Sequence, residues 1–127
     1  MKCQKHEAYD LEERLISFAV RALKVSQSLP KTVEGIHFSK QLLRSGTSPA
    51  AQYAEAQGAE SREDFIHKLK IGLKELRETR VWLLILKKTS LIKNPEKLDD
   101  LLDESNQLIS IFVKSIETTK KNILKTS

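Results

Sequence analysis

The side chains that could bind a metal or act as nucleophiles are few and scattered. The three histidines, His6, His37 and His67, form no pair at the i, i+3 or i, i+4 spacing that places two ligands on one helical face. Cys3 and His6 have the spacing of two metal ligands, but no second pair accompanies them. The sequence therefore predicts no metal site, and we expect no cofactor.

Catalytic motifs are equally scarce. A carboxylate-bridged metal site in a helical bundle needs Glu-x-x-His motifs on two facing helices, and the chain has no such pair of motifs. It also lacks a Gly-rich phosphate loop and a G-x-S-x-G nucleophile elbow. Glu78 is expected to bridge to Lys74 one turn earlier, and Glu75 to be solvated or paired with a neighbouring helix. We expect no catalytic residues and no enzymatic activity.

The basic residues indicate a different kind of chemistry. The net charge is +5, and the excess of basic residues lies in 60–92 and 114–127, with an acidic block between them. A line of cations can follow a phosphate backbone by releasing counterions, although it can equally be a solvated helix face. On a helical wheel of about 100° per residue, four cations share a sector of one helix, and four more crowd the chain end. The first set is Lys70, Lys74, Arg77 and Lys88, and the second is Lys114, Lys120, Lys121 and Lys125.

The elements that carry these residues are predicted to be helices. Only four Gly and three Pro occur in 127 residues, and aromatic residues make up 6%, which disfavours a sheet-rich fold. A single cysteine excludes an internal disulfide. The length fits one domain over residues 1–127, with residues 1–9 and 125–127 expected as tails. No signal peptide or membrane-spanning run is visible, so we expect a cytoplasmic protein.

Apolar periodicity and capping residues predict four helices, near 10–29, 32–58, 61–90 and 95–124. Asp10 and Glu13 suggest a capping box for the first helix, while Thr32 and Ser61 can cap the next two. Pro49 should kink or briefly break the second helix. Short turns between amphipathic helices give an all-α, up-down-up-down four-helix bundle. In the fourth helix, Ile109 and Phe112 are expected in the core.

The third helix has more apolar surface than a monomer needs. Its core face is expected to run through Phe65, Leu69, Leu76 and Leu83, and a second apolar patch falls on roughly the opposite side of the wheel. Such a patch favours self-association, although a central helix covered on both faces would look the same. The patch consists of Ile71, Val81, Trp82 and Ile85.

A long central motif resembles a known family. It comprises Arg44-Ser45-Gly46-Thr47-Ser48, Tyr53-Ala54-Glu55-Ala56, Ala59-x-Ser61-x-x-Asp64-Phe65-Ile66-x-Lys68, and Lys74-Glu75-x-x-Glu78-Thr79-x-x-Trp82-Leu83. This pattern is similar to the bacterial four-helix bundle family first named for proteins encoded in intervening sequences of the 23S ribosomal RNA gene. The family commonly has Ile-Gly-Ala-Asn where this chain has residues 49–52, so Gln52 would have to make the polar contact of that Asn or the contact is lost.

The resemblance implies a bundle that assembles into a ring, typically a homopentamer. A related branch is the accessory protein of diversity-generating retroelements, which binds nucleic acid and partners a reverse transcriptase. Two functions follow as hypotheses. The first is a homo-oligomeric accessory protein that binds RNA or DNA through a basic surface, and the second is a protein–protein adaptor or structural ring with no nucleic-acid role.

Overall fold

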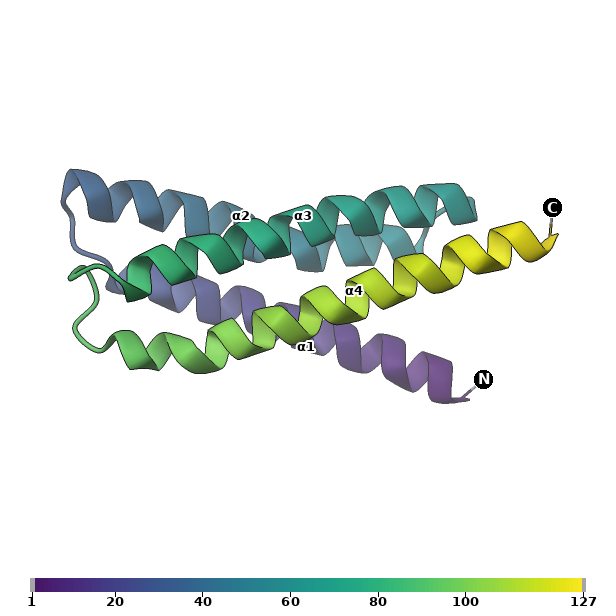
Figure 1. Ribbon diagram of the computed structural model, residues 1–127, viewed down its shortest axis with the longest axis horizontal. Coiled ribbons are helices and arrows are strands. Elements are labelled where there is room, and N and C mark those ends of the chain that lie inside the picture. The colour runs from purple at the N-terminus through teal and green to yellow at the C-terminus, as the bar shows by residue number, and fades with distance from the viewer. Residues whose placement is uncertain (1, 127) are drawn as a thin grey trace.

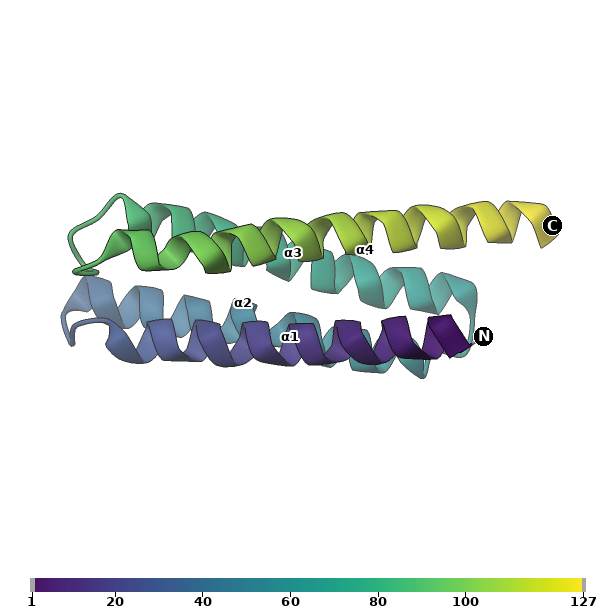
Figure 2. The ribbon, with the colours of Figure 1, turned by 90° about the horizontal axis from the view of Figure 1, so that it is seen from below.

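Four long helices run alternately up and down around a shared core (Figures 1 and 2). The computed structural model describes residues 2–126, with side chains from Asp10 to Lys125. The helices are α1 (Lys2–Ser28), α2 (Val33–Gln57), α3 (Arg62–Lys87) and α4 (Asp99–Thr126), and a short 3-10 helix, η1 (Pro95–Leu98), precedes α4. Residues 2–126 contain no β-strand. The predicted all-α bundle is therefore confirmed.

Local sequence signals set most of the helix ends. Thr32 Oγ1 accepts a hydrogen bond from the backbone N–H of Gly35 at 3.1 Å, and Ser61 Oγ accepts one from that of Asp64 at 3.0 Å. Both side chains thus satisfy donors that the first helical turn leaves unpaired. Gly58 closes α2, and Pro95 opens η1. The caps predicted from Thr32 and Ser61 are confirmed.

Two expectations about helix continuity need correction. The first helix begins at Lys2, so the predicted start at Asp10 is wrong, while the expectation that residues 1–9 form a tail stays a prediction. The segment before Asp10 is rich in good helix formers and has no Gly or Pro, so nothing stops the helix from extending through it. Helix α2 continues without a break through Pro49. The kink there stays a prediction.

Small residues at helix crossings let the bundle close tightly. A Cβ built on Gly46 of α2 would lie 2.5 Å from Cβ of Ala22 on α1, and one on Gly72 of α3 would lie 2.7 Å from the Phe112 ring of α4. These contacts fix how far each helix slides along its neighbour. Phe112 is fully buried as predicted, while Ile109 is half-buried and packs against the core.

Helices α1 and α4 diverge toward the two chain ends (Figures 1 and 2). The gap holds a groove of about 760 Å³, lined by Leu11, Tyr53, Phe65 and Ile111 among others. Elsewhere in the described chain, buried hydrophobic side chains, mainly Leu and Phe, fill the space between the helices. The searched part of the chain contains no helix long and apolar enough to cross a membrane.

Candidate functional site

Three of the predicted cations form an exposed line on α3. Lys70, Lys74 and Arg77 are all exposed, and seven residues of helix separate the first from the last, a length of about 10 Å. No ion pair joins any of them to another residue in the range 10–125. We call Lys70, Lys74 and Arg77 the α3 basic stripe. Their positive charge is available to an external partner.

The lysines of α4 lie in the same half of the molecule as this stripe. Gly72 faces Phe112, and the guanidinium of Arg62 donates a hydrogen bond to the backbone carbonyl oxygen of Asn122 at 3.1 Å. These contacts set the antiparallel register of α3 and α4, which brings the start of α3 beside the end of α4 (Figure 1). Four exposed lysines of α4 belong to this end, and we call them the α4 lysines: Lys114, Lys120, Lys121 and Lys125.

Lys88 is separated from the other predicted cations. It caps the C-terminal end of α3, about 27 Å along the helix from Lys70. Its neighbour Lys87 pairs with Asp99 at the start of α4, where the acidic block begins. The acidic residues therefore lie beside Lys88, at the end of the bundle away from the start of α3. The negative charge of this block is therefore concentrated at the Lys88 end of the bundle.

The acidic side chains near the stripe are neutralised by α2 rather than by α3. Both nitrogens of the Arg44 fork reach α3, one to Glu75 at 2.9 Å and one to Glu78. The expected Glu78–Lys74 bridge is therefore wrong, because a planar guanidinium can hold two carboxylates on a neighbouring helix where a lysine holds one. The hydrogen bond to Glu78, which outweighs partial desolvation, raises the pKa of Arg44. Lys74 is left without an acidic partner among the described side chains.

A second charged contact joins the outer helices. Arg14 of α1 donates to both carboxylate oxygens of Glu104 on α4, at 3.0 and 2.6 Å. The hydrogen bond to Glu104 is the main cause that raises the pKa of Arg14. This ion pair neutralises one carboxylate of the acidic block and joins α1 to α4.

The central motif joins α2 to α3 inside the bundle. Ser45 Oγ and Thr79 Oγ1 are fully buried and hydrogen-bonded at 2.8 Å, and Thr79 Oγ1 also donates to the carbonyl oxygen of Glu75 at 2.8 Å. Together with Arg44, these residues form a polar contact between the two helices. The motif is therefore a helix-packing device. Gln52 does not restore the polar contact of the family Asn through its oxygen, because Gln52 Oε1 is buried without a hydrogen-bond partner.

Only part of the predicted apolar patch faces solvent. Val81 and Ile85 expose 49% and 37% of their surfaces, whereas Ile71 and Trp82 are half-buried. The indole of Trp82 packs edge-on against Phe38 of α2, with ring centroids 5.9 Å apart, and its Nε1 is buried without a partner. Trp82 is not an exposed anchor because a bundle helix has neighbours on two sides, and the apolar sector toward α2 is covered within the same chain.

Exposed aliphatic residues on α1 and α2 were missed by the sequence reasoning. Val33 at the start of α2 has 83% of its surface exposed, and each of four others has 42–44% exposed: Ile16, Val20, Ile36 and Leu43. The i, i+4 spacing of the first two and the i, i+7 spacing of the last two could have indicated a second apolar face. On these two helices the sequence reasoning followed only the residues that face the core.

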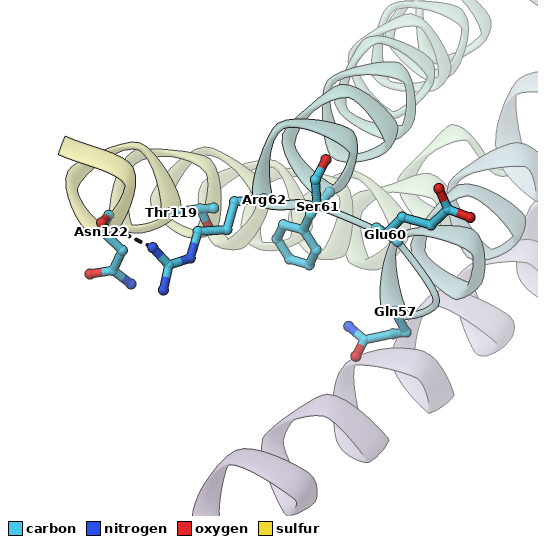
Figure 3. A pocket seen from close by; sticks show the side chains of 9 residues that line it. Gln57, Glu60, Ser61, Arg62, Thr119 and Asn122 are labelled. Atoms are coloured by element: carbon cyan, nitrogen blue, oxygen red, sulfur yellow. Dashed lines mark hydrogen bonds between the residues drawn. The ribbon is translucent and has the colours of Figure 1, made fainter. Parts of the chain in front are cut away.

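Potential sites for small molecules are limited. A shallow pocket of about 490 Å³ lies at the turn between α2 and α3 (Figure 3). Arg62 and Glu60 at its edge point in different directions, and the Arg62 hydrogen bond to Asn122 closes one side. The searched residues contain no group of three or more His, Cys, Asp or Glu side chains that could hold a metal. Cys3 and His6 lie outside the described side chains.

Comparison with known proteins identifies the family of this chain. Residues 7–114 match the family described as 23S rRNA-intervening sequence protein. A crystal structure of a protein of unknown function from the S23 ribosomal protein family of Bacteroides thetaiotaomicron is similar, with 35% identity and a TM-score of 0.78. The alignment covers 87% of this chain and 97% of the other. No curated protein matches the chain. Neither description indicates an enzyme, and the chain belongs to the 23S rRNA-intervening sequence protein family.

Proposed function

We propose that this chain is a non-enzymatic, homo-oligomeric accessory protein that binds the backbone of RNA or DNA. The observation that supports this most is the α3 basic stripe, whose three cations are exposed and have no acidic partner among the described residues. Arg44 on the neighbouring helix differs from them, because it forms ion pairs with Glu75 and Glu78. Charges left unpaired in a line suit a polyanion.

The dimensions of the stripe suit phosphate contacts. It spans about 10 Å, and successive phosphates of one duplex strand are about 3.4 Å apart along the helix axis. The α4 lysines extend the positive surface toward the end of α4. Lysine and arginine contacts to phosphates carry no sequence information of their own. We therefore expect binding that tolerates changes in base sequence.

Self-association would strengthen a weak individual site. Each copy carries a net charge of +5, and several stripes on one assembly would act together through a raised effective concentration. The family resemblance suggests a ring of five copies. Modest affinity per stripe would then be enough for stable binding to a long strand.

The test compares two variants of equal charge. In the first, Lys70, Lys74 and Arg77 are replaced by Ala, and in the control the exposed lysines Lys31, Lys93 and Lys97 are replaced instead. Binding of mixed-sequence RNA and DNA is measured by fluorescence anisotropy at low salt. We expect the stripe variant to lose at least tenfold in affinity, while the control stays within a few-fold of the wild type. Equal losses in the two variants would contradict a localised site.

The alternative is a protein–protein adaptor or structural ring without a nucleic-acid role. The exposed aliphatic residues on α1, α2 and α3 favour it, because they suit apolar partners and not phosphates. Absence of binding to either nucleic acid at low salt would select this function.

A further inference from the structure

The outer face of α3 carries a single line of exposed side chains that includes the α3 basic stripe. Its members recur at alternating intervals of four and three residues, the spacing that keeps side chains on one side of a helix. By the helical step of about 100° per residue, they share a sector of about 80°. In chain order, the line reads Glu63, His67, Lys70, Lys74, Arg77 and Val81. His67 therefore stands one turn before the first cation of the stripe.

The two ends of this line limit the part of it that can contact phosphates. Glu63 is exposed one turn before His67, and its negative charge disfavours a phosphate at that point. At the other end, Val81 exposes 49% of its surface and has no charge or hydrogen-bond donor to offer. Between them lie the three cations of the stripe and His67, whose imidazole carries two N–H donors when it is protonated. The distance along α3 from His67 to Arg77 is about 15 Å.

The imidazole of His67 is not held by another residue of its own helix. No ion pair or hydrogen bond joins it to any residue in the range 10–125. The charged groups one turn away on α3 are Glu63 and Asp64 before it and Lys70 after it. Glu63 is the acid in line with His67, and an exposed pair of this kind is weak. The ring is therefore free to meet an external anion.

The helices packed against α3 also supply no partner to His67. On the α2 side, the acid near this level is Glu55, and it pairs with Lys68 at 3.4 Å. On the α4 side, the antiparallel register places His67 level with Glu117, which is exposed. Lysines stand one turn to either side of Glu117 on α4. The charges around His67 are thus of both signs, and none of them is fixed on its ring.

We propose that His67 forms a fourth phosphate contact beside the α3 basic stripe when its imidazole is protonated, so that the protein binds nucleic acid more tightly in mildly acidic solution. The proposal rests on the proposed function and identifies a further residue of the same site. Histidine changes its charge between about pH 5 and 8, whereas lysine and arginine stay charged throughout that range. A bound phosphate favours the imidazolium form, and by linkage protonation strengthens the binding of the phosphate.

One added contact changes both the affinity and its salt dependence. Each phosphate contact to a duplex adds about 0.9 to the slope of the logarithm of the binding constant against the logarithm of salt concentration. At about 0.1 M salt, this corresponds to roughly fivefold to tenfold in affinity. We therefore expect the wild type to bind about fivefold more tightly at pH 5.5 than at pH 7.5, with a slope steeper by about one unit.

The test compares three single variants with the wild type at these two pH values. His67→Gln cannot gain the charge, and His67→Lys keeps a charge at both pH values. His37→Gln is the matched control, because it removes another exposed histidine, on α2. Binding of mixed-sequence RNA and DNA duplexes is measured by fluorescence anisotropy, and helicity is checked by circular dichroism.

Each variant has its own expected pattern. His67→Gln should bind at both pH values as weakly as the wild type does at pH 7.5. His67→Lys should bind at both as tightly as the wild type does at pH 5.5. His37→Gln should keep the pH dependence of the wild type.

Three results would overturn the proposal: a wild-type affinity that is equal at the two pH values, a pH dependence that His67→Gln retains, or one that His67→Lys retains. The third result keeps the test decisive if His67→Gln loses helicity. None of them removes the α3 basic stripe from the site, provided that replacing Lys70, Lys74 and Arg77 by Ala still weakens binding at the higher pH. Absence of binding at both pH values would reject the proposed function and the role of His67 together.

Discussion

The buried hydroxyl pair between α2 and α3 offers a quantitative test of the role given to the central motif. Ser45 and Thr79 have no exposed surface, and their hydroxyls are 2.8 Å apart. Thr79→Val keeps the shape of the side chain but leaves the Ser45 hydroxyl without this partner. An unsatisfied buried hydroxyl costs about 1–3 kcal/mol, so we expect that loss of unfolding free energy for Thr79→Val.

The double variant separates the hydrogen bond from packing. In Ser45→Ala/Thr79→Val neither helix buries an orphaned hydroxyl, so the loss should be smaller than the sum of the two single losses by about 1 kcal/mol or more. Urea unfolding followed by circular dichroism, at one protein concentration for all four proteins, gives the four free energies. Additive losses would show that the pair does not couple the helices and would refute the packing role of the motif.

Three further predictions follow from single contacts. Gly46→Ala should destabilise the fold by about 1–3 kcal/mol in urea unfolding, because its Cβ would lie 2.5 Å from that of Ala22 and the clash exceeds the gain in helix propensity; a stabilised variant would contradict this. Burial raises the pKa of Tyr53 above its ordinary 10.0. The neutral phenol therefore stabilises the fold fully below pH 10, and this stabilisation is lost as the pH rises through the pKa of Tyr53 in the folded state. Unfolding free energy should therefore fall as the pH rises above 10, and Tyr53→Phe should flatten this fall. Arg44→Met should cost at most about 1 kcal/mol, but it should weaken RNA binding at low salt because Glu75 and Glu78 lose their neutralising partner; unchanged anisotropy would contradict that reasoning.

Much of the fold was predictable because its signals are local. Thr32 and Ser61 cap the helices as expected, and the apolar repeat placed Leu69, Leu76 and Leu83 in the core. The start of α1 was predicted wrongly because a capping pattern at Asp10 does not begin a helix when the residues before it also favour a helix.

The candidate site was predicted less completely, because it depends on contacts between helices. A helical wheel shows which residues share a sector, but not that α2 covers Trp82 or that Arg44 reaches Glu78. The wheel also placed Lys88 in line with Lys70, without showing that Lys87 beside it meets the acidic start of α4. The register of α3 and α4 was needed to group the α3 basic stripe with the α4 lysines.

The most direct test of the proposed nucleic-acid role is the salt dependence of binding. The logarithm of the observed binding constant for a mixed-sequence RNA or DNA duplex is measured against the logarithm of salt concentration, from about 50 to 200 mM. Loss of one phosphate contact lowers the slope by about one unit. Replacing Lys70, Lys74 and Arg77 by Ala should therefore flatten it by about three units, while replacing Lys31, Lys93 and Lys97 should leave it unchanged. Equal slopes for the wild type and the stripe variant would contradict the account.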